Sequence, residues 1–229
     1  MNNMATQRKK KQTTQEDIVT WYTDYCLSHG KKPNSIYEFS KQNGFEETHF
    51  YKYFASFEEL ESDYFSKMFY YTLDLLKENK EYAQYDSAQK LIGFYFTFME
   101  MATANRSFVK FLLEEGKLPL KNITKLKVLR QDFLAFVKTI LEAPLKIENE
   151  KITNIQNKLV HEGTWLQFMS IISFWMHDTS ASFEKTDIYI EKSVKASFDM
   201  VYNVPIESIV DFAKFIWKEK MGSGFTYKN

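Results

Sequence analysis

The sequence has little of what cross-links or interrupts a chain. Its 229 residues include one cysteine, four prolines and seven glycines. A single cysteine excludes an intrachain disulfide and is typical of a reducing compartment. Few prolines and glycines mean few tight turns, which favours long helices over many short strands. We therefore expect an all-α, cytoplasmic protein.

Further absences narrow the classes of function. The longest strongly apolar stretch, residues 165–176, is shorter than the roughly 20 residues that a membrane-spanning helix needs. No apolar segment follows the basic run at the N-terminus, which argues against a secretory signal. The four histidines have no zinc-ligand spacing among themselves or with Cys26. No phosphate loop, serine elbow or paired-carboxylate motif is present, so we predict no enzyme, no metal and no cofactor.

Aromatic side chains are abundant, and the charge is balanced. Aromatic residues make up 17% of the chain, with 21 phenylalanines and 14 tyrosines. Such a quantity must fill a wide core, an apolar cavity or an oligomer interface, and composition alone leaves these three open. The formal net charge is zero, which gives no overall attraction to nucleic acid or to a membrane surface.

Helical periodicity runs along the chain, without any alternating strand pattern. Thr13 and Glu16 have capping-box spacing at the start of a first helix, which ends near Gly30. Asn34 or Ser35 caps a second helix that ends at residues 43–44. The remaining helices are expected at about 47–53, from Ser56 onward, and at about 86–102, 105–116, 122–141, 149–177, 183–202 and 205–221.

These segments predict four parts of the chain. Residues 1–12, with the basic run 8–11, form a disordered arm. Residues 13–55 form a three-helix domain, residues 56–221 form a larger helical domain, and residues 222–229 form a flexible tail.

The segment 18–65 carries a set of residues with clear physical roles. It includes SIYEFSKQNGF at 35–45, THFYKYF at 48–54 and SFEEL at 56–60. Gly44 allows a tight turn, and Phe50 and Phe54, four residues apart, anchor the third helix in the core. This stretch resembles the helix-turn-helix DNA-binding domain of TetR-family regulators. The resemblance implies contacts to double-stranded DNA by Lys41, Thr48, His49, Tyr51, Lys52 and Tyr53.

One position departs from that family pattern. The turn that usually carries a small hydroxyl residue and a glycine or basic residue here carries Glu46 and Glu47. Residues 1–65 contain eight basic and ten acidic side chains, a net charge of −2. A DNA-binding module is normally basic on its contact face. Use of this domain on DNA therefore depends on whether these two carboxylates point at the groove or away from it.

The resemblance also implies that the C-terminal part dimerises and binds a small apolar ligand. Dimerisation would use two of the last three helices in a four-helix bundle. Apolar and aromatic side chains are candidates for the pocket walls, although any single one of them is more simply explained as filling the core. They are Phe98, Met101, Phe108, Phe111, Phe133, Phe136, Trp165, Phe168, Met169 and Trp175.

A second, shorter resemblance gives an alternative. Residues Asp178 to Thr186 are similar to a segment of the lipid-binding accessory proteins of coenzyme Q biosynthesis, which share the TetR architecture. Helix punctuation explains the same residues, with Asp178 ending one helix and Ser182 capping the next. The apolar stripe of residues 206–217 would suit either a membrane surface or packing on the protein's own core or its dimer partner.

We thus expect a TetR-like, ligand-responsive transcriptional regulator that binds operator DNA as a homodimer. The alternative is a lipid- or isoprenoid-binding protein on the same fold that does not bind DNA.

Overall fold

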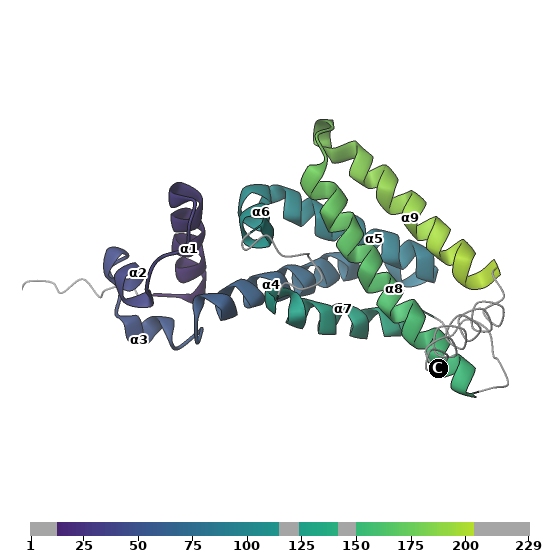
Figure 1. Ribbon diagram of the computed structural model, residues 1–229, viewed down its shortest axis with the longest axis horizontal. Helices are drawn as coiled ribbons and strands as arrows, with labels where there is room; N and C mark the ends of the chain where they lie inside the picture. The colour runs from purple at the N-terminus through teal and green to yellow at the C-terminus, as the bar shows by residue number, and fades with distance from the viewer. Residues whose placement is uncertain (1–12, 115–123, 142–149, 204–229) are drawn as a thin grey trace, which may run out of the picture. The chain divides into compact units, whose positions relative to one another are not determined.

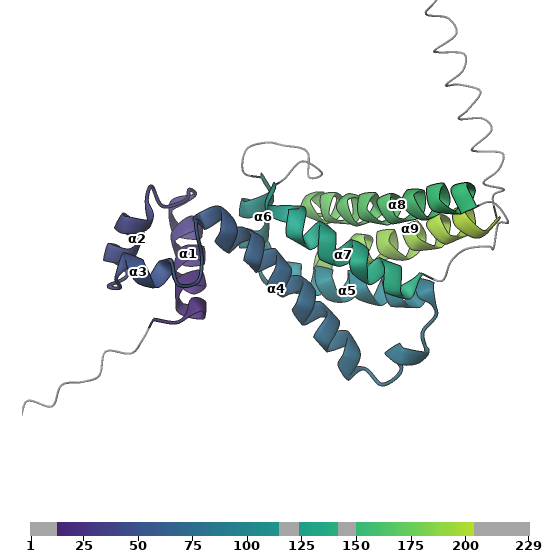
Figure 2. The same ribbon diagram turned by 90° about the horizontal axis from the view of Figure 1, so that it is seen from below.

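The computed structural model describes residues 13–114, 124–141 and 150–203, and every regular element in these ranges is helical (Figures 1 and 2). This confirms the all-α prediction. No helix within these ranges is both long enough and apolar enough to cross a membrane. The predicted basic arm 1–12, the helix at 205–221 and the tail 222–229 lie outside the described residues.

The elements are α1 (Gln15–His29), α2 (Ile36–Gln42), α3 (Glu47–Phe50), α4 (Phe57–Glu78), η1 (Tyr82–Gln84), α5 (Ser87–Ala104), α6 (Arg106–Glu114), η4 (Thr124–Leu126), α7 (Lys127–Ile140), α8 (Glu150–His177), η5 (Ala181–Phe183) and α9 (Glu184–Asn203).

The first helix has a well-formed cap at each end. The capping box uses Thr14 and Asp17, one residue later than predicted, because two overlapping pairs fit the same spacing. Thr14 Oγ1 accepts from the Asp17 amide at 3.2 Å, and Asp17 Oδ2 accepts from the Thr14 amide at 3.0 Å. Gly30 ends α1 with a φ of +64°, and its amide donates to the Cys26 carbonyl at 2.9 Å.

The next two helices are short and joined tightly. Ser35 caps α2 by accepting from the Glu38 amide at 3.1 Å, and Gly44 turns the chain with a φ of +70°. Helix α3 stops at Phe50, whereas the prediction extended it to Tyr53. The amides of Tyr53 and Phe54 both donate to the Phe50 carbonyl at 3.0 Å, so residues 51–53 form a turn instead. We call α1 to α3 with this turn the headpiece.

The chain divides into two compact units. The first contains residues up to Lys67 together with Ala102–Leu129, so it joins the headpiece to the first turns of α4, to α6 and to η4. The second contains Met68–Met101 and the chain from Arg130 onward. In the second unit α8 and α9 lie side by side and run in opposite directions (Figures 1 and 2).

Each unit has its own aromatic core. Phe39 lies at the centre of the first, in edge-on contact with Tyr22, Phe50 and Phe57 at ring-centroid distances of 6.2, 6.3 and 5.6 Å. Phe168 lies at the centre of the second, with its ring centroid 4.8 Å from that of Phe133 and 4.9 Å from that of Phe98. Contacts of this kind add stability beyond the area that they bury.

A buried carboxylate organises the connection between α8 and α9. Asp178 Oδ1 accepts from the Ser180 amide at 2.8 Å and hydroxyl at 2.7 Å, and Oδ2 accepts from the Thr186 amide at 2.9 Å and hydroxyl at 2.7 Å. The prediction that Ser182 caps the next helix is wrong. Ser182 adopts a positive φ of 51° inside η5, and Asp178 instead caps α9 across the turn.

We predict that Asp178→Ala lowers the free energy of unfolding by about 2–4 kcal/mol at neutral pH, because four hydrogen bonds to a charged group are lost. Burial alone would raise the pKa of Asp178, but the hydrogen bonds from Ser180 and Thr186 outweigh it and lower the pKa to about 2. The stabilisation is therefore complete above the ordinary pKa of 3.8 and disappears as pH falls through about 2. Urea denaturation over a pH series measures it, and exposed Asp199→Ala is the control. Equal losses in both variants would contradict the role of Asp178.

Candidate functional site

The exposed face of the headpiece is set by the register of α3. Phe50 and Phe54 are buried, as predicted from their spacing. Because they anchor α3 and the turn after it, the side chains of Thr48, Tyr51 and Lys52 are exposed on the other side. This face can offer a hydroxyl, a phenol and an ammonium group to a partner.

The other predicted contact residues lie on or beside the same elements. Lys41 is exposed on α2, with its ammonium group 5.9 Å from the centre of the exposed Tyr37 ring. Tyr53 is partly exposed, and its hydroxyl donates to the Thr13 carbonyl at 3.4 Å. His49 is half-buried, and its Nδ1 has no hydrogen-bond partner in the described part of the chain. His49 is therefore less accessible to a partner than Thr48, Tyr51 and Lys52.

The two glutamates of the turn behave differently. Glu46 is exposed at the start of α3 and makes no side-chain capping bond. Glu47 is half-buried, and its Oε1 accepts a hydrogen bond from the Tyr51 hydroxyl at 3.1 Å. One of the two carboxylates of the turn is thus hydrogen-bonded to a neighbouring side chain on the same face.

A fully buried glutamate holds the headpiece helices together within the first unit. Glu61 of α4 accepts from the Tyr22 hydroxyl at 2.6 Å, and the Lys32 and Lys125 ammonium groups lie 2.9 and 2.7 Å from its oxygens. Lys125 also donates to the Leu112 carbonyl at 3.0 Å. Burial, and then the Glu61 carboxylate, raise the pKa of Tyr22, so this hydroxyl remains a donor. The cluster joins α1, the α1–α2 connection, α4, α6 and η4.

This cluster changes the charge balance that the sequence indicated. Glu61 contributes no exposed charge, and Lys32 is turned toward it with a side chain only 20% exposed. Asp17 belongs to the cap of α1, and Asp63 pairs with Lys67 at 3.2 Å. The net charge of −2 over residues 1–65 therefore does not describe the exposed face of α2 and α3.

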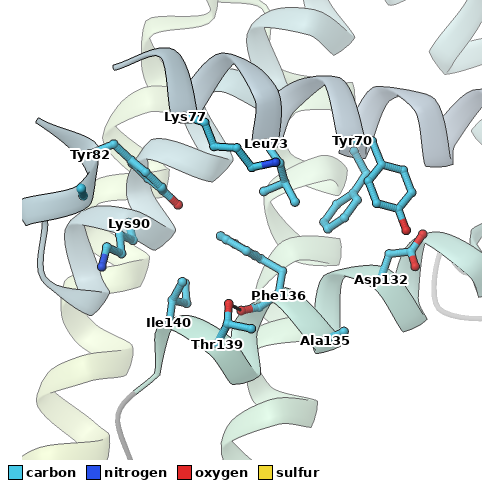
Figure 3. A pocket seen from close by; sticks show the side chains of 12 residues that line it. Tyr70, Leu73, Lys77, Tyr82, Lys90, Asp132, Ala135, Phe136, Thr139 and Ile140 are labelled. Atoms are coloured by element: carbon cyan, nitrogen blue, oxygen red, sulfur yellow. Dashed lines mark hydrogen bonds between the residues drawn. The ribbon is translucent and has the colours of Figure 1, made fainter. Parts of the chain in front are cut away.

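A second candidate site is a cavity in the second unit, between α4, η1, the start of α5 and α7 (Figure 3). Its volume is about 560 Å³, within the range of small-molecule sites. The walls are mainly apolar, with Phe69 and Leu73 from α4 and Phe136 and Ile140 from α7.

Polar groups lie at both ends of the cavity. Tyr82 and Lys90 are at one end, and Figure 3 shows Lys77 reaching toward the space from α4. At the other end Asp132 accepts a hydrogen bond from Tyr70, which raises the pKa of that tyrosine. The cavity therefore has a basic end and an acidic end, separated by apolar walls.

The pocket residues that the sequence nominated do not come together. Phe136 is the one among them that lines this cavity. Phe98, Phe133, Trp165, Phe168, Met169 and Trp175 are buried in the second unit, most of them in its aromatic cluster, and Met101 is half-buried on α5. Phe108 and Phe111 belong to the first unit, where their rings stack at 6.4 Å. Size and hydrophobicity selected mainly core residues and missed the mixed positions 132, 135, 139 and 140, which line the cavity beside Phe136 on α7.

The comparisons with known proteins give one family. A family model described as "Tetracyclin repressor-like, C-terminal domain" matches residues 90–216, more than half of the chain. A search of curated proteins found no match. Nothing in these results bears on the resemblance to coenzyme Q accessory proteins, and three polar residues of that segment, Asp178, Ser180 and Thr186, are engaged in the α9 cap.

We predict that Glu61→Gln lowers the free energy of unfolding by about 3 kcal/mol, because two largely buried ammonium groups lose their counter-charge. Glu58→Gln is a matched control on the same helix. Glu58 also faces Lys32, but at 3.9 Å and with a side chain 74% exposed, so its loss should cost under about 1 kcal/mol. Urea denaturation of the full chain measures both. Similar losses would show that the buried cluster is not the stronger contact.

Proposed function

Because the chain belongs to the TetR family, we propose that it is a ligand-responsive transcriptional regulator that binds operator DNA as a homodimer. The observation that carries the proposal is the exposed face of the headpiece, where Thr48, Tyr51 and Lys52 project from α3 and its turn while Phe50 anchors them. A helix presented in this way fits the major groove, where side chains at its outer surface reach base edges and phosphates.

The contact residues divide by chemistry. Lys41 and Lys52 supply positive charge to phosphates or to guanine edges, while Thr48 and the phenol of Tyr51 offer hydrogen bonds and apolar contact. Contacts to phosphate fix the register, and contacts to base edges carry the sequence preference. The half-buried His49 has a supporting place in this proposal rather than a contact of its own.

We expect the acidic turn to adjust the affinity of this face for DNA rather than to abolish DNA binding. Glu47 is engaged by Tyr51, and Glu61 is neutralised inside the unit. Glu46 is left exposed, and it would repel a phosphate backbone if it faced DNA. Binding should therefore be of modest strength and steeply dependent on salt.

The proposed dimer interface is the outer surface of α8 and α9. Leu166 and Phe174, eight residues apart on one face of α8, are 55% and 36% exposed, and Ile188 of α9 is 49% exposed. Phe174 stacks on Tyr189 at 4.5 Å, so the two helices present one continuous apolar surface. Two such helix pairs related by a two-fold axis form a four-helix interface, and a two-fold dimer presents two headpieces to two half-sites.

Regulation follows if a ligand binds one arrangement of the dimer better than the other. The ligand then shifts the population away from the state whose headpieces match the operator spacing. The alternative, lipid binding without DNA binding, rests on the acidic turn at Glu46 and Glu47 and on residues 178–186. In that segment Asp178, Ser180 and Thr186 are already used in a cap.

We predict that Lys52→Ala weakens binding to the upstream region of the protein's own gene. The slope of log affinity against log salt should fall by about 2, one contact for each protomer. Glu46→Gln should act in the opposite direction and strengthen binding at low salt, because it removes a like charge. Fluorescence anisotropy over a salt series measures both changes.

Lys138→Ala, an exposed lysine on α7, is the matched control and should leave affinity and slope unchanged. Absence of any binding by the folded wild-type dimer at low salt would overturn the proposed function.

We predict that Phe174→Asp converts the dimer into monomers, because association would bury an unpaired carboxylate. Leu166→Asp should do the same independently. Sedimentation velocity measures the mass, with circular dichroism as a check of folding. Val128→Asp, at an apolar residue 40% exposed on α7, should remain dimeric. Dimers in both α8 variants would place the interface elsewhere.

A further inference from the structure

The cavity between α4 and α7 contains a polar atom that its surroundings do not explain. The Tyr82 side chain lines the cavity, and its hydroxyl oxygen is buried without a hydrogen-bond partner among the described residues. Buried polar groups are nearly always paired, so an orphaned one at a cavity wall indicates a partner that arrives with a ligand. Burial raises the pKa of Tyr82 to about 12, so the group is a donor at neutral pH and needs an acceptor.

The same end of the cavity is positively charged. Lys90 is half-buried at the wall and makes no ion pair within the described ranges. Lys77 approaches from α4 (Figure 3), and the acidic partner recorded for it among the described residues, Asp74 at 3.0 Å, is about two-thirds exposed. An exposed pair of this kind is weak, so Lys77 can turn to a stronger acceptor at little cost. This end of the cavity therefore carries one hydroxyl and two ammonium groups, and the exposed Asp74 is the acidic partner recorded for them among the described residues.

The other walls of the cavity limit which further chemical groups a ligand can have. Phe69, Leu73, Phe136 and Ile140 form apolar walls that favour an apolar body. Asp132 at the far end is negatively charged and already accepts from Tyr70. A second anionic group on the ligand would be repelled there.

We propose that this cavity binds a small molecule with an apolar body and a single carboxylate, whose oxygens accept from the Tyr82 hydroxyl and from the ammonium groups of Lys90 and Lys77. The inference rests on the proposed ligand-responsive function and names the chemical class of its ligand. Neutral analogues lack the charge that the lysines require, and dicarboxylates place a second charge against Asp132.

Isothermal titration calorimetry on the full chain tests this ligand class. The probes are decanoate and phenylbutanoate, which offer a linear and an aromatic body, each paired with the corresponding alcohol. Decanedioate is the dicarboxylate. At least one monocarboxylate should bind about tenfold or more tightly than its alcohol, because a charged hydrogen-bonded group is lost in the alcohol. Decanedioate should bind more weakly than decanoate.

Two variants test the residues. Tyr82→Phe removes a hydroxyl that has no partner in the unliganded protein, so thermal stability should be kept while carboxylate affinity falls several-fold. Lys90→Met should lower carboxylate affinity by about tenfold and leave affinity for the alcohol unchanged. Tyr71→Phe and Lys195→Met, at exposed positions outside the cavity, are the matched controls and should bind as the wild type does.

The outcomes separate this inference from the proposed function. Carboxylates that bind no better than their alcohols, or that bind Tyr82→Phe and Lys90→Met as tightly as wild type, overturn the inference. Anisotropy with upstream DNA is measured in parallel. DNA binding without carboxylate binding overturns the inference alone, whereas carboxylate binding at this site without DNA binding supports the site and overturns the proposed function.

Discussion

The Glu61 carboxylate is the constraint on which the first unit depends. A charge with no exposed surface is stable only if its partners are fixed around it, and here Tyr22, Lys32 and Lys125 supply them from three other segments of the chain. Those segments include α1 and the connection to α2, which carry the headpiece. The position of the headpiece relative to the start of α4 is thus held by directional contacts as well as by aromatic packing around Phe39.

The headpiece could be predicted from sequence because its signals are local. Ser35 and Ser56 cap helices through amides three residues away, and Gly44 turns the chain where a positive φ is needed. Phe50 and Phe54 are buried by helical spacing alone. The errors were also local: Thr14 competes with Thr13 for the same box, and α3 gives way to a turn after Phe50.

The parts that sequence reasoning missed depend on distant partners. In the sequence Glu61 is one acid among several on α4. Nothing nearby indicates that Lys32, 29 residues before it, and Lys125 of η4 will both contact its carboxylate. Tyr82 likewise looks like a residue in a short connection. Only the fold shows that its hydroxyl is buried beside a cavity lined by α4 and α7, without a partner among the described residues. Choosing pocket residues by size found Phe133 and Phe168, which pack against each other in the core.

Three buried polar groups in this chain therefore have different consequences. Glu61 and Asp178 are surrounded by donors, so each fixes the backbone segments that supply those donors. The Tyr82 hydroxyl is buried beside a cavity that Lys77 and Lys90 also line, and it has no partner among the described residues, so we propose that a ligand supplies its acceptor. Satisfied buried charge sets the frame of the first unit and the α8–α9 turn of the second. The unsatisfied Tyr82 hydroxyl marks where we propose that the second unit binds its ligand.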